Sequence, residues 1–289
     1  MMRCLPEFSI LDAARPSRLR KVSSRQNALV KDLRRCLARG EPTDDGTIAI
    51  EGRHIIEEAI RSGLKLRAVF FSESAQAQSN ANVQRLLPQI GARVEVLLLP
   101  DEVFASATAT ESPQGVAALV EPRVFTLEQM LAARDPLLIC AIGVQDPGNL
   151  GTMLRSAEAF AAGGVLLGEG TVSAFNSKAV RASAGSVFRL PILAVKMSQA
   201  IRQLRGQGAR VLATSSHKGT PLPEANLTGP LAVLIGNEGA GVPRELLEMT
   251  DEIVAIPHAQ KVESLNAGVA ASLILYEAAR QRKMFSTSI

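Results

Sequence analysis

The sequence predicts an α/β protein with two domains, a small N-terminal one and a larger C-terminal one built on a parallel sheet. At 289 residues, the chain exceeds the usual size of a single domain. Short apolar runs alternate with helical patterns along most of its length. The run LLICAIGV, residues 137–144, has no polar side chain, as expected for a strand buried on both faces in the middle of a parallel sheet.

The N-terminal part divides into a basic extension and a small α/β domain. We expect residues 1–47 to be a helical extension, with a basic helix from Ser24 to Ala38. Residues 48–121 alternate strand and helix patterns and predict a small α/β domain. Its expected strands and helices are 48–51, 53–62, 68–71, a helix ending near residue 90, 94–99 and 115–120.

Residues 122–135 are expected to be a linker with the helix-like segment TLEQMLAAR, and residues 136–289 to be the second domain. Five apolar runs there predict strands, and helical patterns separate most of them. The strands are expected at 137–144, 165–167, 211–214, 231–236 and 253–257, and the helices at 150–162, 199–205 and 265–282.

The net charge of +4 is unevenly distributed. Residues 1–40 hold ten Lys or Arg against three Asp or Glu, an excess of seven, so the remainder sums to −3. A basic arm suits contact with a polyanion, although a solvated terminal helix explains the pattern equally well. With one Tyr and no Trp, base stacking is poorly supplied, so charge and polar groups would hold a nucleic acid.

Composition also limits the compartment and the chemistry. Cys4, Cys36 and Cys140 lie far apart without CxxC spacing, which argues against a disulfide framework and favours a reducing, cytoplasmic location. No run of eighteen apolar residues and no secretory signal pattern occur, so no membrane association is expected. The three histidines form no HExxH or paired Cys/His pattern, so we expect no metal site.

The first segment with chemical interest is DPGNLGTMLRSAEAF, residues 146–160, where a buried strand gives way to a helix. Asn149 can cap that helix, and Gly151 leaves its first turn open to a ligand. Arg155 lies four residues later on the same helical face. Ligands of parallel sheets bind beyond the carboxyl ends of strands, and the alternative is an ordinary turn with a surface arginine.

The second segment is LIGNEGAGVP, residues 234–243, in which an apolar strand ends in a glycine-rich loop. Gly236, Gly239 and Gly241 free backbone N–H groups and permit positive φ. Glu238 could accept hydrogen bonds from hydroxyls or amines. The alternative interpretation is a flexible loop.

The third segment is AIPHAQKVESLNAGVAASLILYEAAR, residues 255–280, which runs from a strand through a loop into the last helix. Ser264 is a suitable N-cap for that helix. Asn266 brings an amide to the helix start, which suits ligand contact, but both residues could serve only as caps.

Two other patterns are weaker. The segment GGVLLGEG, residues 163–170, resembles the glycine pattern of dinucleotide-binding and Rossmann-type methyltransferase loops but lacks the third glycine in register. Ser215, Ser216 and His217 could suggest a nucleophile and a base, but adjacency in sequence does not make a triad, and we expect His217 to be a loop residue. The absence of GxxxxGK[ST] excludes a P-loop.

Together and in this order, the three segments resemble the motifs of the SpoU/TrmH family within the SPOUT methyltransferases, which methylate the ribose 2'-hydroxyl of RNA. The resemblance covers residues 136–283 and departs from the pattern at Asp146, where the family has Asn. IEGRHIIEEAI and SPQGVAALV in the N-terminal domain resemble the family's substrate-binding domain.

The resemblance implies a deep trefoil knot at the C-terminal end, a homodimer with the active site at the subunit interface, and S-adenosylmethionine as cofactor. It implies catalytic roles for Asn149, Arg155, Glu238, Ser264 and Asn266. The cofactor-binding residues that it implies are Thr214, Ile235, Gly236, Asn237, Gly239, Ile256, Pro257, Ser264, Leu265 and Ala270.

The resulting hypothesis is methyl transfer to a ribose 2'-hydroxyl of structured RNA, with 23S rRNA favoured by the type of substrate domain. Three alternatives stay open: a tRNA 2'-O-methyltransferase, a non-catalytic RNA-binding protein of the same fold, and methylation of a base rather than the ribose.

Overall fold

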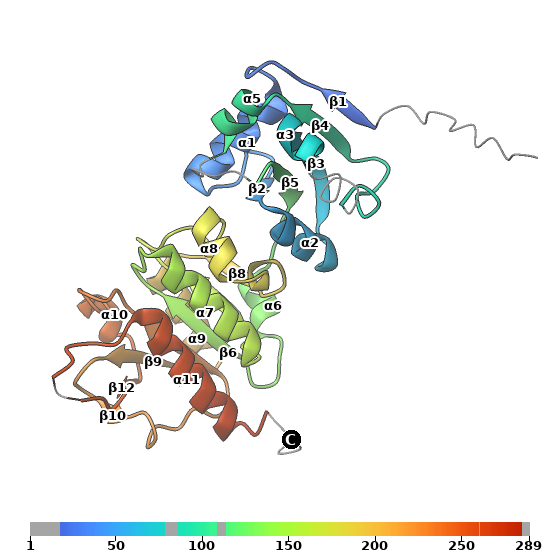
Figure 1. Cartoon of the computed structure of the whole chain (residues 1–289). Coiled ribbons are helices and arrows are strands. Elements are labelled where there is room, and N and C mark those ends of the chain that lie inside the picture. The colour runs from blue at the N-terminus through green and yellow to red at the C-terminus, as the bar shows by residue number, and fades with distance from the viewer. Residues whose placement is uncertain (1–17, 79–85, 109–113, 260, 285–289) are drawn as a thin grey trace, which may run out of the picture.

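The computed structural model describes residues 18–78, 86–108, 114–259 and 261–284. It contains two α/β domains, one above the other in Figure 1. This confirms the predicted α/β class, the parallel C-terminal sheet and the separate N-terminal α/β domain. No helix in these four ranges is long and apolar enough to cross a membrane.

The N-terminal domain is a five-stranded mixed sheet with helices on both faces. The strand order is β1-β4-β3-β5-β2, with β1 and β3 parallel to β4, and β5 antiparallel to β3 and β2. The elements are β1 (Leu19–Lys21), α1 (Ala28–Arg39), β2 (Ile48–Glu51), α2 (Arg53–Arg61), β3 (Lys65–Ser72), α3 (Glu73–Gln78), β4 (Glu95–Leu99), α5 (Asp101–Ala107) and β5 (Val116–Glu121). Part of the helix expected to end near residue 90 lies outside the described residues.

Residues 18–47 are part of this domain, so the expectation of a separate extension through residue 47 is wrong for them. β1 pairs with β4, and α1 buries Val30, Leu33 and Leu37 at helical spacing against the sheet. The apolar face of α1 therefore anchors the helix, and its basic side chains occupy the other face. Residues 1–17 lie outside the described residues.

The C-terminal domain is a seven-stranded, fully parallel sheet in the order β10-β12-β9-β11-β6-β7-β8. The strands are β6 (Leu137–Ala141), β7 (Gly164–Leu167), β8 (Ile192–Ala194), β9 (Arg210–Ser215), β10 (Thr220–Pro221), β11 (Leu231–Ile235) and β12 (Glu252–Ala255). β6 is buried along its whole length in the interior of the sheet, between β11 and β7, as its sequence predicts.

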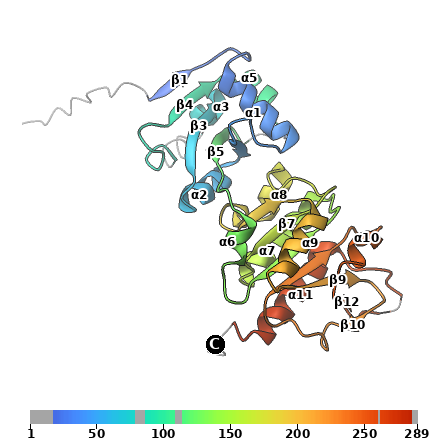
Figure 2. The same cartoon turned by 180° about the vertical axis from the view of Figure 1, so that it is seen from behind.

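Helices cover both faces of this sheet. α7 (Pro147–Ala159), α8 (Ser177–Ala182) and α11 (Ala267–Gln281) lie on one face, in front in Figure 1, and pack on Ile139 and its neighbours. α9 (Met197–Gly206), α10 (Arg244–Leu247) and α6 (Leu127–Leu131) cover the other, where Cys140 and its neighbours are buried, and α9 faces the viewer in Figure 2. Burial raises the pKa of the Cys140 thiol to about 12.

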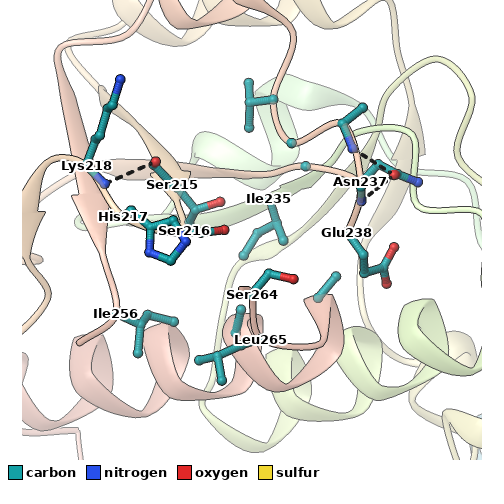
Figure 3. Close-up of a pocket in the computed structure, with 18 of the residues that line it drawn as sticks. Ser215, Ser216, His217, Lys218, Ile235, Asn237, Glu238, Ile256, Ser264 and Leu265 are labelled. Carbon is teal, nitrogen blue, oxygen red and sulfur yellow. Dashed lines mark hydrogen bonds between the residues drawn. The ribbon is translucent and has the colours of Figure 1, made fainter. Parts of the chain in front are cut away.

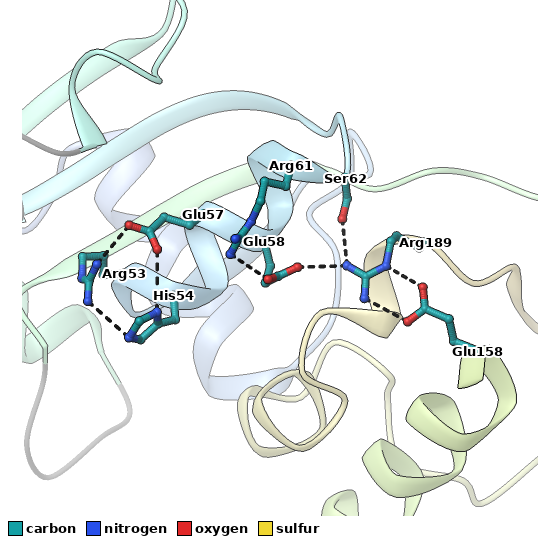
Figure 4. A network of polar contacts seen from close by, with 8 residues as sticks. All are labelled: Arg53, His54, Glu57, Glu58, Arg61, Ser62, Glu158 and Arg189. Atoms are coloured by element: carbon teal, nitrogen blue, oxygen red, sulfur yellow. Dashed lines mark hydrogen bonds and ion pairs between the residues drawn. The ribbon is translucent and has the colours of Figure 1, made fainter. Parts of the chain in front are cut away.

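Arg189 joins the two domains through ion pairs (Figure 4). Its guanidinium donates to both carboxylate oxygens of Glu158 in α7, with Nη2 at 2.9 Å from Oε2. Nη1 lies 3.0 Å from Glu58 Oε2 and 3.3 Å from Ser62 Oγ, both in the N-terminal domain. The hydrogen bonds from Arg189 lower the pKa of Glu158. The junction therefore has a charged contact beside the apolar cluster that the domains share.

We expect Arg189→Gln to lower the free energy of unfolding at pH 7 by about 1 kcal/mol, because each of the three side chains is about one-third exposed and solvent screens the pair. Since the folded-state pKa of Glu158 is lowered, its contribution is complete above the ordinary value of 4.5 and is lost as pH falls through the folded-state value. Urea titrations at pH 7 and pH 3.5 should therefore give a smaller wild-type-minus-variant difference at pH 3.5. Arg244→Gln, which removes an exposed pair between the first residue of α10 and its C-cap Glu248, is the control. An Arg189→Gln difference that does not change with pH would contradict the prediction.

Candidate active site

A cavity of about 440 Å³ lies beyond the carboxyl ends of β9, β11 and β12, the edge at which ligands bind in parallel sheets. In Figure 3, Ser215, His217 and Lys218 lie at one end, Glu238 at the other, and Leu265 below. The cavity is lined by Thr214, Ser215, Ser216, His217, Lys218, Ile235, Gly236, Asn237, Glu238, Gly239, Ala240, Gly241, Val242, Leu247, Ile256, His258, Ser264, Leu265, Ala267 and Ala270.

The glycine-rich loop after β11 folds tightly upon itself. Gly241 N–H donates to Asn237 O at 2.8 Å, which brings the Gly241 backbone so close to Gly236 that a Cβ there would lie 2.1 Å from its carbonyl carbon. The Asn237 side chain accepts from the Gly239 and Ala240 N–H groups and donates to Gly143 O at 2.9 Å. Asn237 therefore holds the loop in shape, and Gly236 is required by space.

Three of the expected catalytic side chains form one hydrogen-bonded chain at the Glu238 end. Asn266 Oδ1 accepts from Val269 N–H at 3.1 Å, so its amide nitrogen is free to donate to Asn149 Oδ1, at 2.7 Å. Asn149 Nδ2 in turn donates to Glu238 Oε1. Because each amide has one donor end and one acceptor end, the first contact fixes the direction of the others. The structure thus brings Asn149, Glu238 and Asn266 together.

Two expected capping roles are wrong. α7 begins at Pro147, and Asp146 is its N-cap, accepting from Asn149 N–H at 2.9 Å. Asn266, not Ser264, caps α11. Asp and Asn side chains can both cap α7, and Ser and Asn side chains can both cap α11. The residue at which the first helical turn begins determines which one is the N-cap. Asn149 is therefore freed from capping, and Ser264 instead lines the cavity.

Gly151 does not leave space for a ligand, contrary to expectation. It is buried, and a Cβ there would lie 2.4 Å from Ala182 Cβ in α8. Gly268 has a similar role at the other side of α7, where a Cβ would lie 3.1 Å from Asn149 O and 3.0 Å from Thr152 Cβ. Both glycines permit close helix packing, and Gly268 brings Asn266 within reach of Asn149.

Arg155 is not part of this cluster within one chain. It lies on the exposed face of α7 and does not line the cavity, and its side chain makes no hydrogen bond or ion pair with any described residue. The side chain is thus free to contact groups from outside this chain.

Nine of the ten residues expected to bind the cofactor line the cavity, and Pro257 does not. Residues 215–218 and His258 also line it, although we did not expect them to bind the cofactor. Residues 215–218 lie at and just beyond the end of β9, so their place at the carboxyl edge of the sheet is the signal that points to them. Ser215, Ser216 and His217 are cavity residues, and no triad hydrogen bond links the two serines to His217.

His258 presents an unusual acceptor at the cavity. Its Nδ1 lies 2.7 Å from Ile256 O, and because a carbonyl only accepts, Nδ1 carries the proton. In the tautomer that carries this single proton, Nε2 is an acceptor. It is buried and has no hydrogen-bond partner among the described residues, and the His217 ring lies beside it with centroids 5.5 Å apart. An N–H group of a ligand would satisfy this atom. No group of three or more His, Cys, Asp or Glu side chains in the described ranges is placed to hold a metal ion.

Two family profiles match the chain. The SpoU rRNA methylase family matches residues 136–276, which contain the whole cavity. The MRM3-like substrate binding domain matches residues 27–118, a range that includes α1.

Individual proteins agree with these profiles. The 23S rRNA (guanosine(2553)-2'-O)-methyltransferase RlmP of Bacillus subtilis is 34% identical over 258 residues, covering 89% of this chain and 98% of that protein. The SpoU methyltransferase AviRb from Streptomyces viridochromogenes, solved with AdoMet, has a TM-score of 0.78 and 29% identity, covering 90% of this chain and all of that one. An AdoMet-bound rRNA methyltransferase from Sinorhizobium meliloti has a TM-score of 0.76 and 29% identity, with 93% and 100% covered. The chain therefore belongs to the SpoU family of RNA methyltransferases.

Proposed function

We propose that this protein transfers a methyl group from S-adenosylmethionine to a ribose 2'-hydroxyl of 23S rRNA. The observation that carries the proposal is the chain of hydrogen bonds from Asn266 through Asn149 to Glu238 at one end of a glycine-lined cavity. The named activity of the B. subtilis relative, which aligns over nearly its whole length, supports the choice of RNA.

The cavity suits S-adenosylmethionine in size and in lining. Its volume lies in the usual range for small-molecule sites. Ile235, Ile256 and Leu265 offer an apolar surface for a purine, and the exposed backbone of Gly239 and Gly241 offers polar groups. The unpartnered His258 Nε2 suits an amino group of the ligand. When bound, S-adenosylmethionine supplies an activated methyl group on a positively charged sulfur.

The side chains of this protein then have to position the hydroxyl. Asn149 and Asn266 hold the Glu238 carboxylate at the cavity end, where it can accept a hydrogen bond from a ribose hydroxyl. Holding two reactants in line can lower a barrier by ~7–11 kcal/mol. Ser264 lines the same cavity and offers a further hydroxyl for orientation.

Arg155 is proposed as the electrostatic partner of the developing alkoxide and of the adjacent phosphate. A guanidinium keeps its proton at physiological pH, so it does not act as a general base. Because Arg155 lies outside the cavity of its own chain, this role requires a second subunit that brings its arginine to the cavity.

A homodimer is part of the proposal. Val269, Leu273 and Tyr276 follow one stripe of α11 and are 46%, 40% and 54% exposed, an apolar surface that is wider than one core-facing helix needs. Tyr276 packs edge-on against Phe160, the C-cap of α7, with ring centroids 5.9 Å apart, so the apolar surface extends from α11 to the end of α7. Arg155 precedes Ser156, whose hydroxyl oxygen lies 2.7 Å from Ser272 Oγ of α11.

We also propose the trefoil knot that the resemblance to the SpoU family implies, and the path of the chain around the cavity supports it. After β12 the chain returns past the loop at residues 236–242, with which residues 256, 264 and 265 share the cavity, and then enters α11, which packs on α7. A cytoplasmic location is proposed as well, and the three cysteines, far apart in sequence and without CxxC spacing, support a reducing compartment.

We expect the wild-type protein to place a 2'-O-methyl group on 23S rRNA, detected by mass spectrometry of the digested nucleosides after incubation with S-adenosylmethionine. Arg155→Ala and Arg155→Lys should both lose turnover while cofactor affinity stays within a few fold, because a lysine lacks the planar fork. Arg202→Lys, on the opposite face of the sheet, is the control. A methylated base, methylation of tRNA alone, or normal turnover in Arg155→Lys would each contradict the assignment.

Gly236→Ala should reduce S-adenosylmethionine affinity at least about tenfold, because the added Cβ would collide with the Gly241 backbone and open the loop. Calorimetry measures the affinity, and circular dichroism checks that the fold persists. Gly206→Ala is the matched control, since a Cβ there meets nothing within 4 Å. Equal affinity in both variants would show that the loop does not shape the cofactor site.

Leu273→Asp should convert the dimer to a monomer and abolish methylation together, because it puts a charge into the proposed apolar interface. Light scattering should give twice 30.7 kDa for the wild type and half of that mass for the variant. Val124→Asp, at an apolar residue that is 87% exposed elsewhere, should change neither. A fully active wild type of monomer mass would refute the dimer.

A further inference from the structure

Helix α8 touches both the N-terminal domain and the catalytic helix α7. At its start, the Gly40 backbone lies so close to Asn176, the N-cap of α8, that a Cβ on Gly40 would be 2.9 Å from Asn176 Cα. Ser173 Oγ also donates to Gly40 O. Further along, Ala182 packs on Gly151, two residues after Asn149. Figure 1 shows α8 in this position between the two domains.

Cationic side chains follow this connection. Lys178 and Arg181 are three residues apart on the exposed face of α8, opposite the buried Ala179 and Val180. Arg39, the last residue of α1, is exposed immediately before Gly40. We call Arg39, Lys178 and Arg181 the junction cations.

No acidic side chain among the described residues neutralises the junction cations. None of the three forms an ion pair or a side-chain hydrogen bond with a described residue. Other arginines near the junction are neutralised, since Arg53 pairs with Glu57, and Arg189 with Glu58 and Glu158. Glu41, two residues after Arg39, is exposed and adds one negative charge. Because the junction cations carry three positive charges, the surface stays net positive.

We propose that the junction cations bind successive phosphates of the RNA strand that runs from the substrate-binding domain to the catalytic cavity. This inference rests on the proposed function. Unpaired exposed cations bind phosphate without reading the base sequence, and a single Tyr in the whole chain leaves little aromatic surface for stacking. Through α8, the junction cations lie between the N-terminal domain, which contacts α8 at Gly40, and α7, which contacts α8 at Gly151 and carries Asn149.

Such contacts have a measurable signature. Each lost phosphate contact lowers the slope of log affinity against log salt by about 0.7–0.9. The junction cations do not line the cofactor cavity, so S-adenosylmethionine affinity should not change. They act on RNA binding and position, so KM for RNA should rise while kcat at saturating RNA stays near the wild-type value.

The test compares Lys178→Gln/Arg181→Gln with Lys196→Gln/Arg202→Gln, which removes the same charge from exposed, unpaired residues at α9 on the opposite face of the sheet. Binding to a 23S rRNA fragment is measured by fluorescence anisotropy between 0.05 and 0.3 M salt, roughly the range in which counterion release dominates. The first variant should lose about tenfold or more in affinity and about 1.5 in slope, and adding Arg39→Gln should lower the slope further.

An unchanged slope in Lys178→Gln/Arg181→Gln, or an equal loss in the control variant, would overturn the proposal. Binding is read without methyl transfer, so the proposal can be judged separately from the reaction. If the wild type binds this RNA with the expected slopes but does not methylate it, the junction cations stand and the proposed activity fails. If the variants bind normally and methylation proceeds, the activity stands and the junction cations fail.

Discussion

The hydrogen bonds from the first turn of α11 through Asn266 and Asn149 to Glu238 connect the candidate catalytic groups to the rigid part of the fold. They form because α11 lies against α7 at Gly268, where no side chain keeps the two helices apart. The direction of each bond follows from the backbone N–H of Val269, so no rearrangement of the amides is needed when a substrate arrives. The geometry of the active site is therefore a consequence of helix packing.

Much of the fold could be predicted from the sequence because long apolar runs dominate it. The buried strand at residues 137–141 and the strands at 231–235 and 252–255 stand out by composition, and a parallel sheet places their carboxyl ends at one edge. That single rule predicts that the three motifs converge. Strands of two or three residues, such as β8 and β10, carry no periodic pattern and could not be found in this way.

The sequence-based expectations for β1, Asn149 and Gly151 were wrong because the structure of each depends on residues far away in the chain. β1 is a strand only because β4 lies beside it, 75 residues later, as the Arg20–Glu95 pair shows. The role of Asn149 depends on Glu238 and Asn266, which are 89 and 117 residues away, so its local suitability as a cap was misleading. Gly151 was assigned to a ligand because its neighbour Ala182 belongs to a short helix that the sequence did not predict.

The backbone lining of the cavity has a consequence for small-molecule inhibitors. Main-chain atoms are the same in every sequence, so a compound that contacts only the loop at residues 236–242 would discriminate poorly among proteins that share this loop conformation. The cavity also offers side chains at its other end, those of His217, Lys218 and His258. A selective inhibitor would therefore extend toward these three residues and donate a hydrogen bond to His258 Nε2.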